Sequence, residues 1–169
     1  GAGVIFGASG GVMEAALRTV TDVLTKEDLT NLDYHAVRGE EGVKEASLKI
    51  GDMTVNVAVA HSMVLAKPLL EEIKNGTSKY HFIEIMGCPG GCVNGGGQSY
   101  VNALTRNSSF DWKQARAKAL YDEDLALPVR KSHKNSQIQK LYADFLGEPN
   151  SEKAHHLLHT HYTRKERFK

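Results

Sequence analysis

The sequence has few cysteines, no long apolar run and little net charge, and each shortage excludes a class of protein. Two cysteines in 169 residues are too few for a disulfide framework, so we expect a reducing compartment. No apolar stretch approaches the roughly 20 residues of a transmembrane helix, and no signal-peptide pattern opens the chain. The net charge of +1 gives no reason to expect a nucleic acid or a membrane as a partner.

The length and composition are those of an ordinary globular protein. Hydrophobic residues make up 41% of the chain and charged residues 24%, and 169 residues suffice to bury a core. The sequence begins with Gly1 rather than Met, and a strand-like stretch, GVIFGASGG, follows almost at once. We therefore expect these residues to continue a longer polypeptide.

The first segments predict a short buried strand over Gly3–Phe6, a glycine turn and then a helix over residues 12–26. Apolar residues of this helix recur at helical spacing: Val12, Ala16, Leu17, Val20 and Leu24. Ser9 is placed to cap the start of the helix, and Glu14 suits the positive end of its dipole.

A hairpin, a second helix and a third strand are predicted next. Residues 45–60 alternate apolar and polar side chains on both sides of a Gly51–Asp52 turn, which is typical of a β-hairpin. Residues 62–76 predict a helix that is kinked or restarted at Pro68, and residues 80–86 predict a strand. This order predicts an α/β fold, a sheet flanked by helices.

After Asn107 the chain is expected to be all-helical. Three helical segments are predicted, with Ser108 or Ser109, Asn135 and Ser151 as their caps and a stop at Gly147. These segments carry too few apolar residues for an independent bundle, so we expect a C-terminal extension that wraps the sheet domain. The predicted division is therefore 1–108 and 109–169.

The stretch Phe82–Gln98, FIEIMGCPGGCVNGGGQ, holds both cysteines in a glycine-rich loop. A helix with both sulfurs on one face is disfavoured by the glycines and Pro89. A disulfide is a poor structural device in a reducing compartment, and a redox pair usually has two residues between its cysteines. A zinc half-site needs a further pair or histidines. Iron–sulfur ligation explains more, since glycine lets the backbone approach an inorganic cluster, although a 4Fe-4S cluster needs four ligands.

Three stretches resemble the iron-only (di-iron) hydrogenases. The cysteine loop resembles the last cysteine motif of that family, and VIFGASGGVMEAALR resembles the segment that packs against the same cofactor. Residues from about Asp111 to Tyr162 are similar to the small-subunit helical belt that monomeric members carry fused at their C-terminus. The resemblance implies the C-terminal part of the catalytic large subunit, in which the sheet flanked by helices forms half of the cofactor-binding domain, followed by this belt.

The resemblance also implies a cofactor and its ligands. The cofactor is a 4Fe-4S cluster joined through one cysteine sulfur to a di-iron subcluster with CO, CN and dithiolate ligands. Cys88 would ligate the cluster, and Cys92 would ligate it and bridge to the di-iron unit. The remaining pocket residues would be Met86, Phe6, Val12, Gly87 and Gly91. No catalytic residue is expected in this chain, because the proton relay of the family lies upstream.

The implied activity is reversible H2 oxidation and proton reduction, with this chain inactive alone because it supplies two of four cluster cysteines. The expected partners are the missing N-terminal part of the same protein and either ferredoxin or an NAD(P)-linked flavoprotein subunit. Members with a fused belt are cytoplasmic, so the resemblance implies a cytoplasmic location.

Two other interpretations stay open. The chain could belong to a non-catalytic iron–sulfur assembly relative that binds a cluster without the di-iron unit. It could also be a metal-free interaction module in which the two cysteines are incidental. His155, His156, His159 and His161 form a further cluster, for which we predict a structural or surface role rather than a metal site.

Overall fold

The computed structural model describes residues 1–28, 30–39 and 42–166, and the chain divides into two compact units, Gly1–Ser132 and His133–Lys169. The elements of the first unit are η1 (Val4–Gly7), α1 (Gly11–Thr25), η2 (His35–Val37), β1 (Lys44–Ile50), β2 (Met53–His61), α2 (Met63–Lys74), β3 (Phe82–Met86), η3 (Cys92–Asn94), α3 (Ala103–Arg106) and α4 (Trp112–Ala126). The second unit contains α5 (Ser136–Leu141), η5 (Tyr142–Leu146) and α6 (Glu152–Leu158), and the short η4 (Ser132–Lys134) lies at the division.

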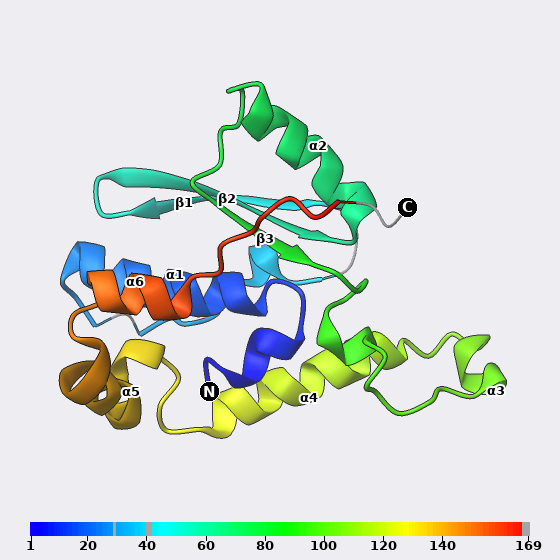
Figure 1. Cartoon of the computed structure of the whole chain (residues 1–169). Helices are drawn as coiled ribbons and strands as arrows, with labels where there is room; N and C mark the ends of the chain where they lie inside the picture. Colours follow the sequence, from blue (N-terminus) through cyan, green and yellow to red (C-terminus); the bar gives the residue numbers. More distant parts are fainter. Residues whose placement is uncertain (29, 40–41, 167–169) are drawn as a thin grey trace. The chain divides into compact units, whose positions relative to one another are not determined.

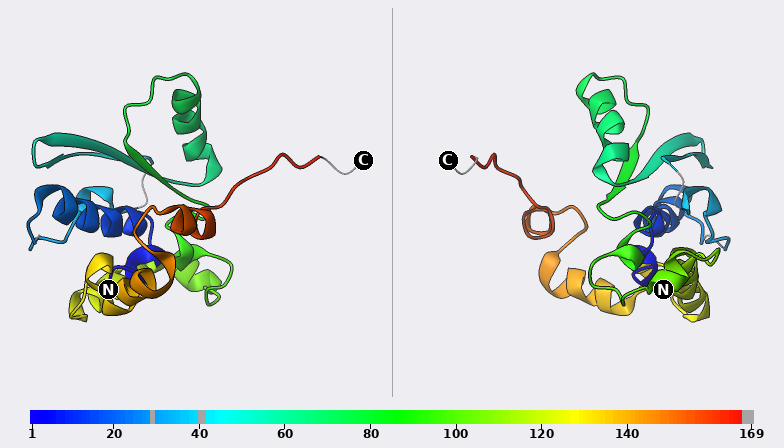
Figure 2. Two further views of the ribbon diagram at one scale, coloured as in Figure 1. Left: turned by 60° about the vertical axis from the view of Figure 1, so that its left-hand side comes forward. Right: turned by 90° about the vertical axis from the view of Figure 1, so that its right-hand side faces the viewer.

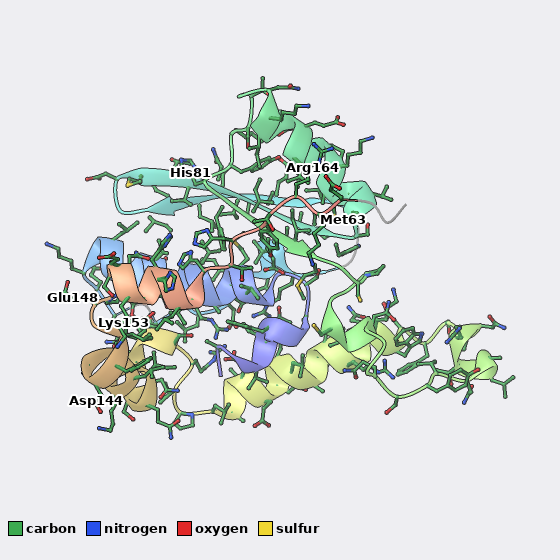
Figure 3. The ribbon with its side chains drawn as sticks, in the orientation of Figure 1. Met63, His81, Asp144, Glu148, Lys153 and Arg164 are labelled. Atoms are coloured by element: carbon green, nitrogen blue, oxygen red, sulfur yellow. The ribbon has the colours of Figure 1, made fainter. Side chains whose placement is uncertain are left out.

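A three-stranded sheet with the order β1-β2-β3 forms the centre of the first unit. β1 and β2 form the predicted antiparallel hairpin, in which Ile50 faces Met53 across the turn. β3 pairs in parallel with β2 after the α2 crossover, from Val57 opposite Phe82 to His61 opposite Met86. His81, labelled in Figure 3, lies where β3 begins, and its Nδ1 accepts a hydrogen bond of 3.0 Å from the Asn56 amide.

Helices α1 and α2 cover opposite faces of the sheet, as Figure 1 and the two views of Figure 2 show. Met13 and Leu17 of α1 pack against Val57 and the other side chains of one sheet face. Leu69 of α2 packs against Ala58 on the other face. Because successive strand residues point to opposite faces, the apolar run of β2 supplies both layers. The α/β prediction, a sheet flanked by helices, is confirmed.

The predicted strand over Gly3–Phe6 is wrong, because the segment forms the 3-10 helix η1. A run of three apolar residues between glycines fits a strand or a helical turn equally well, so periodicity could not separate them. The prediction that Ser9 caps α1 is also wrong. The N-cap is Gly10 at a φ of +89°, and its close approach to the Val37 carbonyl leaves no room for a Cβ atom.

Helices α1 and α2 differ in detail from the prediction. α2 continues through Pro68 without a break, so the helix does not restart there, and the alternative of a kink stays a prediction. On α1, Leu17 is buried as expected, whereas Val20 and Leu24 are exposed by 38% and 47%. Among the described residues, no helix is long and apolar enough to cross a membrane.

α4 packs against η1, which joins the predicted helical extension to the glycine-rich start of the chain. The helix begins at Trp112 and is capped by Asp111, whose carboxylate accepts the amides of Lys113 and Gln114. The predicted caps Ser108 and Ser109 therefore lie before the helix. Ser108 instead binds the carbonyl of Thr105 through its hydroxyl.

A buried charge network joins α1 to the end of α4. The Arg18 guanidinium donates to Glu14 Oε1 (2.7 Å) and to both oxygens of Asp124 (2.9 and 2.8 Å), and all three side chains are fully buried. The Arg130 guanidinium also donates to Asp124 Oδ2 (2.8 Å), and the Arg38 guanidinium donates to Glu14 Oε1 (2.7 Å). Burial opposes the charge on Asp124, but the bonds from Arg18 and Arg130 outweigh it and lower its pKa.

The second unit is a set of short helices with the caps that the sequence predicts. Asn135 accepts the Gln137 amide at the start of α5, and Ser151 accepts the Ala154 amide at the start of α6. Gly147, at a φ of +80°, ends η5, which is a π-helical turn. Lys153, labelled in Figure 3, lies with its Nζ 3.7 Å from the centre of the Phe145 ring.

Candidate functional site

The two cysteines lie in the loop that leaves the C-terminal end of β3. Met86 ends the strand opposite His61, and its carbonyl accepts a hydrogen bond of 2.7 Å from the Ser62 amide. The loop therefore starts beside the point where β2 ends and α2 begins. In open α/β sheets, the carboxyl ends of parallel strands are where ligands bind.

Successive turns hold the cysteine loop in shape. The Gly91 amide donates to the Cys88 carbonyl (2.9 Å), and the Gly95 amide donates to the Cys92 carbonyl (2.9 Å). The Asn94 side chain also donates to the Pro89 carbonyl (3.0 Å). The loop is thus a series of tight turns, with one 3-10 turn, η3, that begins at Cys92 itself.

Both cysteines are free thiols, Cys88 half-buried and Cys92 exposed. They are not joined in a disulfide, which removes one alternative for the pair. Within residues 1–28, 30–39 and 42–166, no group of three or more His, Cys, Asp or Glu side chains could hold a metal ion. A metal or cluster at this loop would therefore take two ligands from the described part of the chain, Cys88 and Cys92.

The cysteine loop packs directly on the turn between η1 and α1. The Ser9 amide donates to the Gly90 carbonyl (3.0 Å). Gly91 has a φ of +97°, and a Cβ atom there would lie 2.7 Å from the carbonyl oxygen of Gly7. Only glycine allows so close an approach with that backbone conformation. Gly87, in contrast, has open space around it, so the structure gives no steric reason for a glycine there.

The three apolar residues of the predicted pocket come from three neighbouring elements. Phe6 lies on η1 and is 44% exposed, an unusual environment for a large aromatic side chain. Val12 lies in the first turn of α1, and Met86 ends β3; both are half-buried. η1 contacts η3, and α1 contacts β3, so the structure brings these elements together beside the cysteine loop.

Arg116 of α4 holds the far side of the loop, and sequence reasoning missed it. Its guanidinium donates to the carbonyls of Val93 (2.9 Å) and Ser99 (2.7 Å), and it stacks over the Trp112 ring at 4.9 Å. The planar guanidinium of arginine carries several N–H donors in fixed directions, so it can bind two carbonyls at once. The compact ammonium group of lysine lacks this geometry. The spacing of Trp112 and Arg116, one helical turn apart, was the available signal.

Glu84, two residues before Met86 on β3, was also missed. Its carboxylate accepts the amides of Gly10 and Met13, both at 2.7 Å, and the residue is 6% exposed. Burial raises the pKa of Glu84, and the two backbone hydrogen bonds oppose that rise. The signal in the sequence was a carboxylate inside an apolar strand, where a charge needs a partner.

A cavity of about 580 Å³ lies on the α4 side of the contact between the cysteine loop and the glycine turn. Its walls include Ser9, Gly90, Arg38 and Tyr121. Ser9 Oγ and Tyr121 Oη are buried and have no hydrogen-bond partner among the described residues. Burial, with the nearby Glu14 carboxylate, raises the pKa of Tyr121, so its hydroxyl keeps its proton at neutral pH.

The histidine cluster lies in the second unit. The His155 and His159 rings are 4.3 Å apart, and the His155 and His161 rings are 6.1 Å apart. All three residues are exposed. The structural or surface role expected for these histidines stays a prediction.

Two protein-family profiles match most of the chain. The profile of the family described as iron only hydrogenase large subunit, C-terminal domain, matches residues 1–96, and that of the iron hydrogenase small subunit matches residues 110–165. The chain belongs to the iron-only hydrogenase family, as the C-terminal part of the large subunit followed by small-subunit sequence.

The relatives support this assignment along the whole chain. The NADP-reducing hydrogenase subunit HndD of Solidesulfovibrio fructosivorans is 46% identical over 99% of the chain, and iron hydrogenase 1 of Clostridium pasteurianum is 46% identical over 96%. In each case the chain spans 28% of the relative's length. A solved structure of a variant of the FeFe-hydrogenase HydA1 from Chlamydomonas reinhardtii has a TM-score of 0.68 and 38% identity, over 93% of this chain and 45% of that one.

A second group of relatives is less similar. The cytosolic Fe-S cluster assembly factor narfl of Danio rerio is 30% identical over 91% of the chain, which spans 36% of that protein.

A further similar structure is that of the FeFe-hydrogenase HydA(deltaEFG), which concerns stepwise assembly of the H-cluster. Its TM-score is 0.66, with 38% identity over 93% of this chain and 46% of that one.

Proposed function

We propose that this chain is the C-terminal part of an iron-only hydrogenase that catalyses reversible H2 oxidation and proton reduction. The observation that carries the proposal is the loop at the end of β3, which contains two free cysteine thiols and several glycines. The backbone of this loop packs against the end of η1 and the turn after it. Membership of an enzyme family supports it. The chain is expected to be inactive alone, because it supplies two of the four cysteines that a 4Fe-4S cluster requires.

The residues present fit the proposed cofactor, a 4Fe-4S cluster joined to a di-iron subcluster with CO, CN and dithiolate ligands. Cys88 would hold the cluster, and Cys92 would hold it and bridge to the di-iron unit. Gly91 has no side chain, so the loop can pack closely against the Gly7–Ser9 backbone. The two cysteine thiols are the groups of this loop that can bind iron. When bound, the cofactor would supply the iron at which dihydrogen is cleaved and the cluster that carries the electrons.

The chain's own residues would bind this cofactor and shield it. Phe6, Val12 and Met86 present apolar side chains from η1, α1 and β3, and an apolar wall excludes water from the metal. Arg116 would keep the loop on α4 through the carbonyls of Val93 and Ser99. Gly87 is assigned to the pocket by family resemblance alone.

The rest of the active site is proposed to lie in the missing N-terminal part of the same protein. That part would supply the other two cluster cysteines and the proton relay, and it would determine whether ferredoxin or an NAD(P)-linked flavoprotein exchanges the electrons. A cytoplasmic location and the division into a large-subunit lobe, 1–108, and a helical belt, 109–169, are parts of the same proposal.

The second candidate is a non-catalytic iron–sulfur assembly protein, favoured by the similarity to narfl at 30% identity. Such a protein would use the same two cysteines for a cluster and would lack the di-iron unit. Dihydrogen turnover separates the two candidates, because only a hydrogenase reduces a viologen dye with H2.

The test uses the full-length protein, purified anaerobically with its cofactor. We expect H2-dependent dye reduction in the wild type and its loss in Cys88→Ser and Cys92→Ser, with a fall in iron per chain in at least one of them. Lys118→Met, which alters an exposed pair on α4, serves as the matched control and should retain wild-type activity and iron. Wild-type iron content without any H2 turnover would support the assembly candidate instead.

A further inference from the structure

We propose that Glu84 is a positioning residue that locks the apolar wall of the cofactor pocket onto the strand leading to the two cysteines. This inference rests on the proposed function and adds to it a residue that does not touch the cofactor. The wall is the segment that runs from η1, which carries Phe6, through the glycine turn to the first turn of α1, which carries Val12, and the strand is β3.

The contact is short, buried and made by both carboxylate oxygens. Glu84 Oε1 accepts the Gly10 amide and Oε2 accepts the Met13 amide, each at 2.7 Å. These amides belong to the N-cap and the first turn of α1, where helices leave amides without a partner inside the helix. A negative charge is also favoured there by the helix dipole. Glu84 therefore does from a neighbouring strand what a capping side chain does within a helix.

The contact between Glu84 and the start of α1 lies beside the proposed cofactor pocket, so it affects the positions of residues that line this pocket. Glu84 lies on β3, four residues before Cys88 of the loop that follows the strand, and Val12 lies between the two amides that the carboxylate binds. A shift of α1 relative to β3 would therefore move Val12 relative to the cysteine loop. The carboxylate is a fixed link between the two sides of the proposed pocket.

A second tie, on the other side of the turn, limits the motion that remains. The Ser9 amide donates to the Gly90 carbonyl, and the Gly91 backbone lies against Gly7. With Glu84 on one side and the loop backbone on the other, the turn is attached to the β3 segment both before and after the first cysteine. Loss of Glu84 would leave the wall held at the loop alone.

The test compares Glu84→Ala and Glu84→Gln with the wild type in the full-length, cofactor-loaded protein. Glutamine keeps one acceptor oxygen and places an NH2 group against the other amide, so it should hold the turn only partly. The control is Glu45→Gln, on β1 of the same sheet, where the side chain is 49% exposed and pairs with Lys79. Three quantities are measured: the infrared bands of metal-bound CO and CN, iron per chain, and hydrogen exchange of residues 7–17.

We expect exchange of the Gly10 and Met13 amides to become at least about tenfold faster in Glu84→Ala, as for loss of a hydrogen bond to a charged group. Iron per chain should fall in Glu84→Ala. Glu84→Gln should retain iron but show shifted or split infrared bands, and Glu45→Gln should match the wild type. Unchanged bands in Glu84→Gln, together with unchanged iron in Glu84→Ala, would overturn the positioning role, even if both variants melted earlier.

Failure of the proposed function would give a different result. If the wild type contained iron but showed no CO or CN bands, the proposal that this protein is a hydrogenase would be refuted. Iron per chain and amide exchange would then decide the role of Glu84 at a simple cluster. A fall in iron with faster exchange in Glu84→Ala would support the role, and unchanged values of both would overturn it.

Discussion

Arg18 is the residue whose replacement should destabilise the first unit most clearly. Its guanidinium is fully buried and donates five hydrogen bonds: to Glu14, to both oxygens of Asp124, and to the carbonyls of Leu32 and Arg130. Arg18→Met keeps much of the side-chain volume and removes all five. It leaves two buried carboxylates whose remaining arginine partners, among the described residues, are Arg38 and Arg130.

Removal of one member of a buried ion network typically costs about 3–5 kcal/mol, because the remaining charges stay in a medium of low polarity. We expect a loss within this range, and not above it, since each carboxylate keeps one arginine. With a urea m-value of about 2 kcal/mol/M, a loss of about 4 kcal/mol lowers the unfolding midpoint by about 2 M. Lys118→Met removes an exposed pair, with side chains 71% and 59% accessible, and should cost less than about 1 kcal/mol.

Urea unfolding of residues 1–169, followed by fluorescence of Trp112 on α4, the one tryptophan in this sequence, measures this effect. A double variant, Arg18→Met with Asp124→Asn, neutralises one stranded carboxylate and should recover about 1–3 kcal/mol relative to the sum of the single effects. If Arg18→Met cost no more than Lys118→Met, the network would not hold α4 to α1 as described.

Two further predictions concern the loop and acid pH. Gly91→Ala forces a Cβ atom against the Gly7 carbonyl at a φ of +97° and should lower the free energy of unfolding by about 1–3 kcal/mol. It should also lower the iron content per chain of the full-length protein. Gly96→Ala, with open space around it, should change neither; equal effects in the two variants would refute the steric argument. Asp124 has a folded-state pKa below its usual value of 3.8, so its stabilisation is present above about pH 4 and is lost as the pH falls through the folded pKa. Unfolding free energies at pH 7 and pH 3 should therefore differ less in Asp124→Asn than in the wild type, and an unchanged difference would contradict the assignment.

The parts of the fold that follow from local patterns were predictable. The hairpin follows from alternation on both sides of Gly51, and the strand before the cysteines is β3 as expected. The caps Asn135 and Ser151 also follow from residue type alone. In each case the pattern involves residues close together in the sequence, so tertiary contacts did not override it.

Tertiary contacts decided the parts that were missed. Glu14 was expected only to suit the dipole of α1, and nothing was predicted for Arg18, yet both are fully buried, where α4 and Arg38 bring charges of opposite sign to them. Lys131, which follows α4, was not predicted to be buried either, yet it is 6% exposed and pairs with Asp22. The sequence gives no local sign of a partner about a hundred residues away.

The candidate site shows the same division. The cysteine spacing and the glycines predicted a loop that could ligate iron, and the structure has a loop of tight turns with two free thiols. Glu84 and Arg116, which hold that loop and the neighbouring turn, were not predicted. Their partners are backbone groups of distant segments, and a backbone amide or carbonyl carries no signature in the sequence.

In the proposed function, Cys88 and Cys92 hold an iron–sulfur cluster joined to a di-iron unit in the full-length protein. The infrared spectrum of that protein, purified anaerobically with its cofactor, tests the claim most directly, because CO and CN bound to iron absorb where protein groups do not. We predict CO and CN bands in the wild type and their loss in Cys92→Ser. A protein that contains iron but shows no such bands, or a Cys92→Ser variant that keeps them unchanged, would contradict the account.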